Sequence, residues 1–297
     1  MRCGLLVIGA VLAAGCAPRR GGTAVAPAPA SPGPASSATE PTSPIAAPKG
    51  PESVRYGPSA LRYLVHRRVH TQQALGGQEQ ATDVGARIYV AAAITGPADG
   101  IGYPTTFMVD SIVPDSGTPP QVAAPMSRAR RLIFSGRVSP RGEFVNSVPS
   151  DSALAQSLVQ VLANFREFLP RIPADGLKPT AVWTDTLQTT QKGAGSEVSR
   201  RAVVQSTTAA WEEQEGQRRL RLEANSRYEV GGNGQNANGP FELSGTGTTF
   251  IVSFLAADGR YWGGESHDST AVTVRLPVQG VAVPVIQLTH TTVAVLP

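Results

Sequence analysis

The chain after residue 58 alternates apolar and polar positions with a period of two. In the first such run, Leu61, Tyr63 and Val65 share one face of an extended chain. We expect a strand at each run of this kind, because turn residues separate the runs. The runs are Leu61–Val65, Arg87–Val90, Thr106–Val109, Leu132–Val138, Glu143–Val145, Val182–Leu187, Arg201–Ala210, Arg219–Val230, Phe241–Phe254, Ser269–Leu276 and Val281–Val295. The pattern predicts a mainly β fold, with a hairpin turn at Ser139–Gly142.

One segment, residues 151–169, replaces the period of two with a helical period. Its apolar positions are Leu154, Leu158, Val161, Leu162, Phe165 and Phe168. Ser150 or Asp151 can cap its start, and Pro170 can end it. We therefore expect one amphipathic helix packed on a curved antiparallel sheet or half-barrel, an α+β architecture that is mainly β. A two-sheet sandwich with a peripheral helix is the alternative.

Three residues of this helical stripe, Leu158, Leu162 and Phe165, bear on function. If they pack into a filled core, the helix only covers the sheet. If they line a water-excluded cavity between helix and sheet, the protein could carry an apolar ligand such as a lipid. The sequence leaves both interpretations open.

The first sixteen residues have the pattern of a bacterial lipoprotein signal peptide. Arg2 gives a positive start, Leu5–Leu12 an apolar run, and small residues precede Cys16. This ending resembles the lipobox, which is cut before a cysteine that carries a diacylglycerol. We therefore predict that residues 1–15 are removed and that Cys16 becomes the lipid-anchored N-terminus. Ala17, and not Asp, follows this cysteine, so in a diderm organism we expect the outer membrane.

A plain secretory signal or an uncleaved anchor is the alternative, although the apolar run is shorter than the roughly 20 residues that span a bilayer.

After the cysteine, residues 17–58 hold ten of the 25 prolines and lack an apolar face. We interpret 16–58 as a lipidated, disordered tether and 59–297 as a single globular domain. An ordered arm packed on the domain is the alternative. Loss of Cys3 with the signal leaves one cysteine, which excludes an internal disulfide.

Composition excludes three classes of protein. With 41% hydrophobic and 16% charged residues, the chain is too apolar to be wholly disordered and too polar to be a polytopic membrane protein. A formal charge of +4 over 297 residues is too dilute for a nucleic-acid-binding surface. We expect no nucleic-acid partner.

Catalytic and metal motifs are weak. His66 and His70 lie four apart, which places both on one face of a strand, but no third ligand has a recognisable spacing. Ser266, His267 and Asp268 are consecutive, so on a strand they cannot form a catalytic triad. The glycine-rich segment Gly231–Gly239 lacks the ending of a phosphate loop and is interpreted as a flexible loop. We expect no metal, no cofactor and no enzymatic activity.

Three groups of residues between positions 60 and 230 resemble an uncharacterised family of secreted bacterial lipoproteins. They are Gln72-Gln73 with Gly76-Gly77-Gln78-Glu79-Gln80, Gly136 with Val138-Ser139-Pro140-Arg141-Gly142-Glu143, and Leu169-Pro170 with Pro179 and Val182-Trp183-Thr184-Asp185. The resemblance implies neither a reaction nor catalytic residues. The expected architecture is also similar to that of bacterial lipid-carrier lipoproteins, whose curved sheet holds an acyl chain beneath helices.

Three functions follow in order of preference. The first is a non-catalytic lipoprotein of the cell envelope that binds a protein or glycan partner. The second is a carrier of an apolar ligand, either a lipid or a lipoprotein. A hydrolase is the least favoured.

Overall fold

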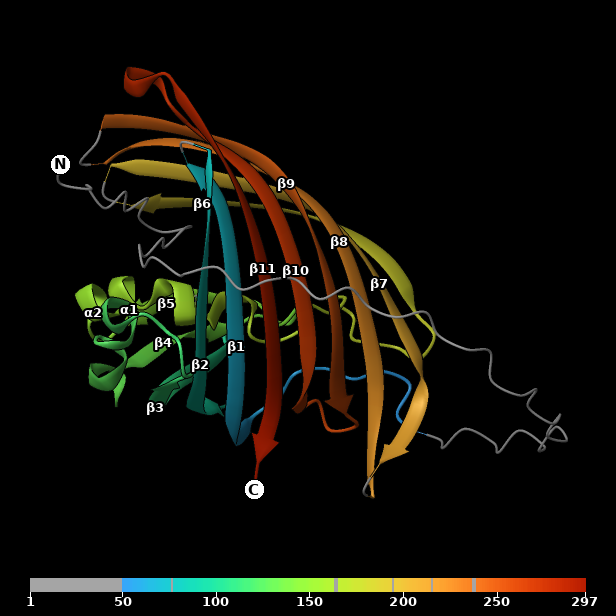
Figure 1. The fold of residues 1–297 in the computed structure, drawn as a ribbon. Helices are drawn as coiled ribbons and strands as arrows, with labels where there is room; N and C mark the ends of the chain where they lie inside the picture. The colour runs from blue at the N-terminus through green and yellow to red at the C-terminus, as the bar shows by residue number, and fades with distance from the viewer. Residues whose placement is uncertain (1–49, 76, 163–164, 194, 215, 237–238) are drawn as a thin grey trace, which may run out of the picture.

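The computed structural model describes residues 50–297 except 76, 163–164, 194, 215 and 237–238. The predicted signal peptide, Cys16 and most of the predicted tether lie outside the described residues. Within the described ranges, eleven strands form one antiparallel sheet (Figure 1). The mainly β prediction is confirmed, and a single curved sheet takes the place of the sandwich alternative.

Every predicted run of alternating residues matches a strand, although Leu132 and Glu143 lie one residue before β4 and β5. The strands are β1 (Ser59–Leu75), β2 (Gln78–Ile94), β3 (Tyr103–Pro114), β4 (Ile133–Val138), β5 (Phe144–Pro149), β6 (Val182–Gly193), β7 (Ser196–Gln214), β8 (Gln217–Asn236), β9 (Gly239–Ala256), β10 (Tyr261–Leu276) and β11 (Val281–Leu296). The helical pieces are α1 (Pro120–Ala123), η1 (Met126–Ala129), α2 (Ser152–Ser157), α3 (Val159–Leu162), η2 (Phe165–Glu167) and η3 (Pro277–Gln279).

The strand order is β5-β4-β3-β2-β1-β11-β10-β9-β8-β7-β6. The chain meanders from β1 to one edge, crosses through the helical pieces after β5, and meanders back until β11 pairs with β1. The long strands arch around the helices and the short strands β3 to β5 (Figure 1). In the described residues β5 and β6 do not pair with each other, so the sheet is not closed into a barrel.

Ion pairs connect the two edges of the open sheet. Arg141, in the turn between β4 and β5, pairs with Asp185 of β6. Arg171 pairs with Glu143 and approaches Asp185 at 3.5 Å. Burial lowers the pKa of the Arg171 guanidinium below its ordinary value. This partly buried network holds the first and last strands of the order near each other without backbone pairing.

The sheet has two different faces, because side chains alternate along every strand. Val65 of β1 lies in register with Ile88 of β2 and Val293 of β11, on the face that carries the hydrophobic core. We call this the core face. The next residue, His66, points to the opposite side, which we call the open face.

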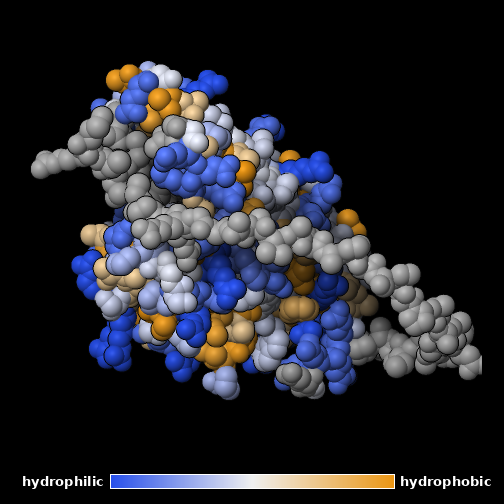
Figure 2. All heavy atoms as spheres, in the orientation of Figure 1, coloured by the Kyte–Doolittle hydropathy of each residue, from blue (hydrophilic) through white to orange (hydrophobic). Residues whose placement is uncertain are grey.

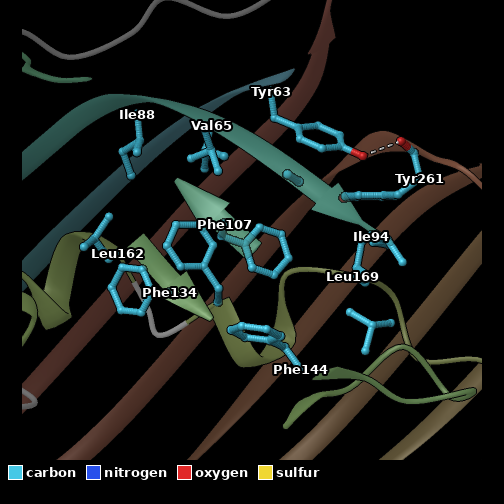
Figure 3. Close-up of a cluster of buried hydrophobic side chains, with 14 of the residues drawn as sticks. Tyr63, Val65, Ile88, Ile94, Phe107, Phe134, Phe144, Leu162, Leu169 and Tyr261 are labelled. Carbon is cyan, nitrogen blue, oxygen red and sulfur yellow. Dashed lines mark hydrogen bonds between the residues drawn. The ribbon is translucent and has the colours of Figure 1, made fainter. Parts of the chain in front are cut away.

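The main core lies between the core face, β3 to β5 and the helical pieces after β5 (Figure 3). Phe107 is fully buried there. Its ring stacks on Phe165, with centroids 5.0 Å apart, and meets Phe144 edge-on at 4.9 Å. Tyr63 donates a hydrogen bond of 3.0 Å to the main-chain oxygen of Tyr261. Each such buried side chain stabilises the fold by roughly 1.5–3 kcal/mol, which fixes the helical pieces on the sheet.

A single helix over 151–169 is not shown, because the described residues of the segment form the short pieces α2, α3 and η2. The predicted cap is present, since the Asp151 side chain accepts a hydrogen bond from the Leu154 amide. The Ser157 hydroxyl then donates to the Leu154 carbonyl at 2.7 Å, a local bond that competes with helix continuation. Serine and β-branched valine are also weak helix formers. No helix in the described part of the chain has the length and apolar character to cross a membrane.

The last residues of the predicted tether pack on the domain. The predicted tether boundary at residue 58 is therefore wrong. Val54 is buried and exchanges two main-chain hydrogen bonds of 2.8 Å with Leu177. Tyr56 is also buried, and its hydroxyl donates to the main-chain oxygen of Pro170. Val54 and Tyr56 thus extend the core. The sequence pattern did not reveal them because they lie among prolines and outside any run that alternates with a period of two.

The predicted flexible loop at Gly231–Gly239 is wrong for most of its length, because β8 continues to Asn236. It passes a second apolar cluster on the core face. This cluster consists of Phe241, Leu243, Val272, Val274, Leu276, Val283 and Val285. Gly234 lies opposite Phe241, and a Cβ at Gly234 would lie 2.7 Å from that ring. The glycines therefore allow close packing within a strand.

Candidate functional site

The open face of the sheet carries a broad hollow of about 1760 Å³. It spans seven neighbouring strands, from β2 across β1 and β11 to β7, and the chain after β3. The side chains that define the hollow are those of His66, Arg68, His70, Asp83, Arg87, Asp115, Val203, Gln205, Asn225, Arg227, Thr248, Phe250, His267, Ser269, Leu288 and His290. On the surface shown in Figure 2, hydrophilic and hydrophobic side chains are interspersed.

All four histidines of the chain lie in this hollow. His66 and His70 come from β1, His267 from β10 and His290 from β11. The pairing register explains the grouping, because His267 lies directly opposite His290, which in turn lies opposite Arg68. Positions 200 residues apart in the sequence thus become neighbours when β11 pairs with β1.

Glu265 holds two of these histidines. Its Oε1 atom accepts hydrogen bonds from Nε2 of His290 at 2.6 Å and from Nε2 of His267 at 3.0 Å. The two imidazole rings stack with centroids 4.5 Å apart and an interplanar angle of 10°. The hydrogen bond from His290, followed by the other contacts with these rings, lowers the pKa of Glu265 below its ordinary value. The carboxylate is therefore ionised at neutral pH.

The other two histidines pair with aspartates. His66 Nε2 lies 2.8 Å from Asp115 Oδ2, and His70 Nδ1 lies 2.7 Å from Asp83 Oδ1. Asp115 can approach because residue 85 is glycine, where a Cβ would lie 2.4 Å from its Oδ2 atom. Loop and sheet are joined by the hydrogen bond of 2.8 Å from the Asp115 amide to the Gly85 carbonyl. One wall of the hollow is therefore fixed by the chain that follows β3.

Apolar side chains are exposed among these charged groups. Val203, Phe250 and Leu288 lie on β7, β9 and β11, and they are 46%, 38% and 47% exposed. All three line the same hollow, and the register places the polar residues Arg227, Thr248 and Ser269 between Val203 and Leu288. The hollow thus combines apolar contact area with hydrogen-bonding and charged groups.

The three residues predicted to line either a ligand cavity or the core do not belong to this hollow. Leu158, Leu162 and Phe165 are buried in the main core, on the core face of the sheet. The space beneath them is occupied by aromatic rings, because Phe165 contacts both Phe107 and Phe134. Cys16, the predicted lipidation site, lies outside the described residues.

The sequence interpretation of the histidines was right in one respect and incomplete in another. His66 and His70 share a face, as their spacing predicts. His267 lies on the open face and Asp268 on the core face, as expected for adjacent strand residues. The grouping of Glu265 with His267 and His290 was missed. A Glu-x-His pattern on a strand was visible, but its third member needed the register of β10 with β11.

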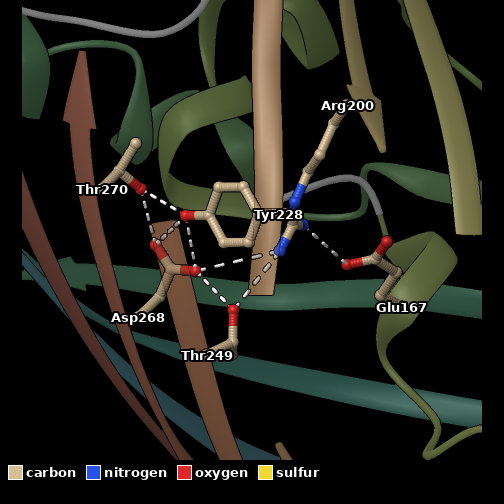
Figure 4. Close-up of polar contacts among 6 residues, drawn as sticks. All are labelled: Glu167, Arg200, Tyr228, Thr249, Asp268 and Thr270. Carbon is tan, nitrogen blue, oxygen red and sulfur yellow. Dashed lines mark hydrogen bonds and ion pairs between the residues drawn. The ribbon is translucent and has the colours of Figure 1, made fainter. Parts of the chain in front are cut away.

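A polar network on the core face has a structural role (Figure 4). Asp268 accepts hydrogen bonds from Tyr228 at 3.0 Å and from Thr249 at 2.7 Å. Arg200 stacks over the Tyr228 ring at 3.8 Å and reaches Glu167 of η2 at 3.9 Å. Burial is the main reason that the pKa of Tyr228 rises to about 12. The network attaches η2 to strands β7 to β10.

Comparison with known proteins gives little. No family model matches the chain, and no curated protein does. Among solved structures, the chain is similar to OccK2 (OpdF) of Pseudomonas aeruginosa, with a TM-score of 0.31, 9% sequence identity, and coverage of 80% of this chain and 98% of the other. A likeness this loose carries no information about function.

Proposed function

We propose that the chain is a non-catalytic binding module of the bacterial cell envelope, and that its hollow receives a segment of a partner protein. The observation that carries this proposal is the hollow itself, where exposed Val203, Phe250 and Leu288 lie among charged side chains of both signs. Protein interfaces have this composition, with apolar contact area inside a polar rim.

The size of the hollow favours a macromolecular ligand. Its volume of about 1760 Å³ exceeds the roughly 300–1,000 Å³ of typical small-molecule pockets. Arg227 is exposed at its far wall, and Arg68 and Arg87 lie at the near wall with Asp115. These charges can select and orient a ligand that extends across the strands.

A protein segment fits the hollow better than a glycan does. Phe250 could stack on a sugar ring, but the exposed aliphatic side chains of Val203 and Leu288 would then remain without partners. A polypeptide would use both, because its own apolar side chains can cover them. Glycan binding is therefore an outcome of the test.

The proposal includes attachment to the envelope through a lipid on Cys16, most simply at the outer membrane of a diderm organism. The support is the sequence pattern before that cysteine. The proline-rich residues 17–49 would extend the domain up to about 100 Å from the membrane at ~3.1 Å per residue. A module on such a tether can reach partners that are not themselves in the membrane.

Photocrosslinking in the source cells tests the proposal. p-Benzoylphenylalanine in place of Phe250 keeps an aromatic ring in the hollow. Val278, which is 74% exposed in η3 and outside the hollow, is the matched control position. We expect one discrete protein adduct from position 250 and not from position 278. That adduct should disappear when Leu288→Asp is added, because the charge removes apolar contact area from the same hollow.

Two kinds of result would count against a protein partner in the hollow. Equal adducts from positions 250 and 278, or none from either, would contradict the proposal. An adduct with the mass of a sugar polymer or a lipid would replace the protein partner with another class of ligand.

A further inference from the structure

Glu265, His267 and His290 have the chemistry and the placement of a metal site. Glu265 and His267 are two residues apart on β10, so both point to the open face, and His290 lies directly opposite His267 on β11. We infer that these three side chains bind a divalent transition metal ion, with zinc as the best match. The inference goes beyond the proposed partner binding and does not depend on it.

The ligand atoms are already close together. Glu265 Oε1 lies 3.0 Å from His267 Nε2 and 2.6 Å from His290 Nε2, and the three ligand atoms all lie within 4.8 Å of one another. In a tetrahedral zinc site with bonds of about 2.0–2.1 Å, ligand atoms are roughly 3.3–3.4 Å apart. The two carboxylate–imidazole separations therefore differ from the tetrahedral value by less than about 1 Å.

The strands hold these side chains in place. The stacked rings of His267 and His290 direct both Nε2 atoms at the same carboxylate oxygen. Cross-strand neighbours on a central pair of strands keep their separation without a loop that must become ordered. The side chains of Glu265 and His267 are half exposed, so an ion can enter from solvent.

The surrounding charge permits a cation. On the open face, the register places Phe250 and Val252 of β9 on one side of the cluster and Thr292 of β11 on the other. The charged neighbour is Arg68, opposite His290. Its Nε atom lies 3.3 Å from Nε2 of His66 on β1 and 3.7 Å from the carboxylate of Asp115 in the chain after β3.

Two imidazoles and one carboxylate select the kind of ion. Zinc accepts this set, and three protein ligands leave one position open for water or for another molecule. Calcium and magnesium prefer sites built from oxygen alone. An open position in the floor of the hollow would let an acidic side chain of a partner complete the coordination.

Zinc titration of the full chain, purified in detergent and treated with a chelator, tests the inference. Calorimetry at neutral pH should show one zinc ion per chain. Cobalt in place of zinc should give visible absorption bands. His290→Ala and Glu265→Gln should each weaken zinc binding at least tenfold, and circular dichroism checks that both variants remain folded.

His70→Ala is the matched control. It removes an imidazole from the same hollow that also pairs with a carboxylate, so zinc affinity should stay within about twofold of the parent. Absence of zinc binding by the parent chain would overturn the inference. So would equal losses in His70→Ala and His290→Ala, or unchanged affinity in folded His290→Ala. The crosslink at position 250, measured with chelator present, reports separately on the proposed partner.

Discussion

At the scale of single residues, contacts with carboxylates orient the four histidine side chains. Each imidazole is held by an acidic neighbour, with Asp115 and Asp83 on the β1 side and Glu265 on the β10 side. These pairs are at least partly exposed, so they contribute little to stability. Their effect is to keep imidazole and carboxylate groups oriented in the hollow, ready for a ligand.

The first prediction at this scale concerns the lipidation of Cys16, which lies outside the described residues. Cys16→Ser should abolish diacylglycerol attachment, so the chain should remain an uncleaved precursor and lose its lipid. Intact mass and membrane fractionation of the parent and the variant measure this. The same mature mass and the same membrane fraction for both chains would contradict the lipoprotein proposal.

Glycine in β8 gives a second prediction at this scale. A Cβ at Gly232 would lie 2.3 Å from the main-chain oxygen of Glu197, whereas at Gly231 the nearest atom would be 3.9 Å away. Gly232→Ala should therefore lower the free energy of unfolding by roughly 1–3 kcal/mol. Gly231→Ala is the neighbouring control and should cost less than about 1 kcal/mol. Urea unfolding of both variants decides, and equal costs would mean that the strands are not packed this closely.

At the scale of elements, the strands and the helical period of 151–169 were predictable, and the interruption of the helix was not. Period-two alternation in Leu61–Val65 and in each later run is a local property, so the sequence reports it directly. The helical period of 151–169 is also real, since the buried residues Leu158, Leu162 and Phe165 follow it. Continuity of the helix depended on weak propensities and on the Ser157 hydroxyl, which a hydrophobic pattern does not register.

The substitution Phe165→Ala tests whether the helical segment packs into a filled core. In a filled core the substitution should lower the free energy of unfolding by roughly 3–5 kcal/mol, because Phe165 packs on Phe107 and Phe134. Val148→Ala, at a side chain that is 65% exposed, is the control and should change stability by less than about 0.5 kcal/mol. A near-zero cost for Phe165→Ala, with co-purified lipid in the parent, would favour the apolar-ligand carrier instead.

At the scale of the whole molecule, the pairing of β1 with β11 makes the site. It joins the two halves of the sheet and brings residues 66–70 beside 288–292. One sequence cannot reveal this register, because every strand has the same period and could pair with several others. The same limit explains why Val54 and Tyr56 were placed in a tether, since their partners are more than a hundred residues away.

Deletions locate the true boundary of the domain. Removal of residues 17–49 should leave the melting temperature within a few degrees, as expected for a tether. Removal of 17–58 also deletes Val54 and Tyr56 from the core, and the melting temperature should fall by at least roughly 5 °C. Calorimetric melts of the two deletions and the parent make the comparison. A similar large fall in both would show that the arm packs on the domain.

Thiol accessibility in the intact envelope tests most directly whether the hollow is a binding site. The predicted mature chain has Cys16 as its one cysteine, and lipid would block that thiol, so Leu288→Cys introduces a single reactive group. We predict that a maleimide labels this cysteine at least tenfold more slowly in intact envelopes than in purified protein. Val278→Cys, outside the hollow, should react at similar rates in both. Equally fast labelling of Leu288→Cys in envelopes and in purified protein would contradict the account.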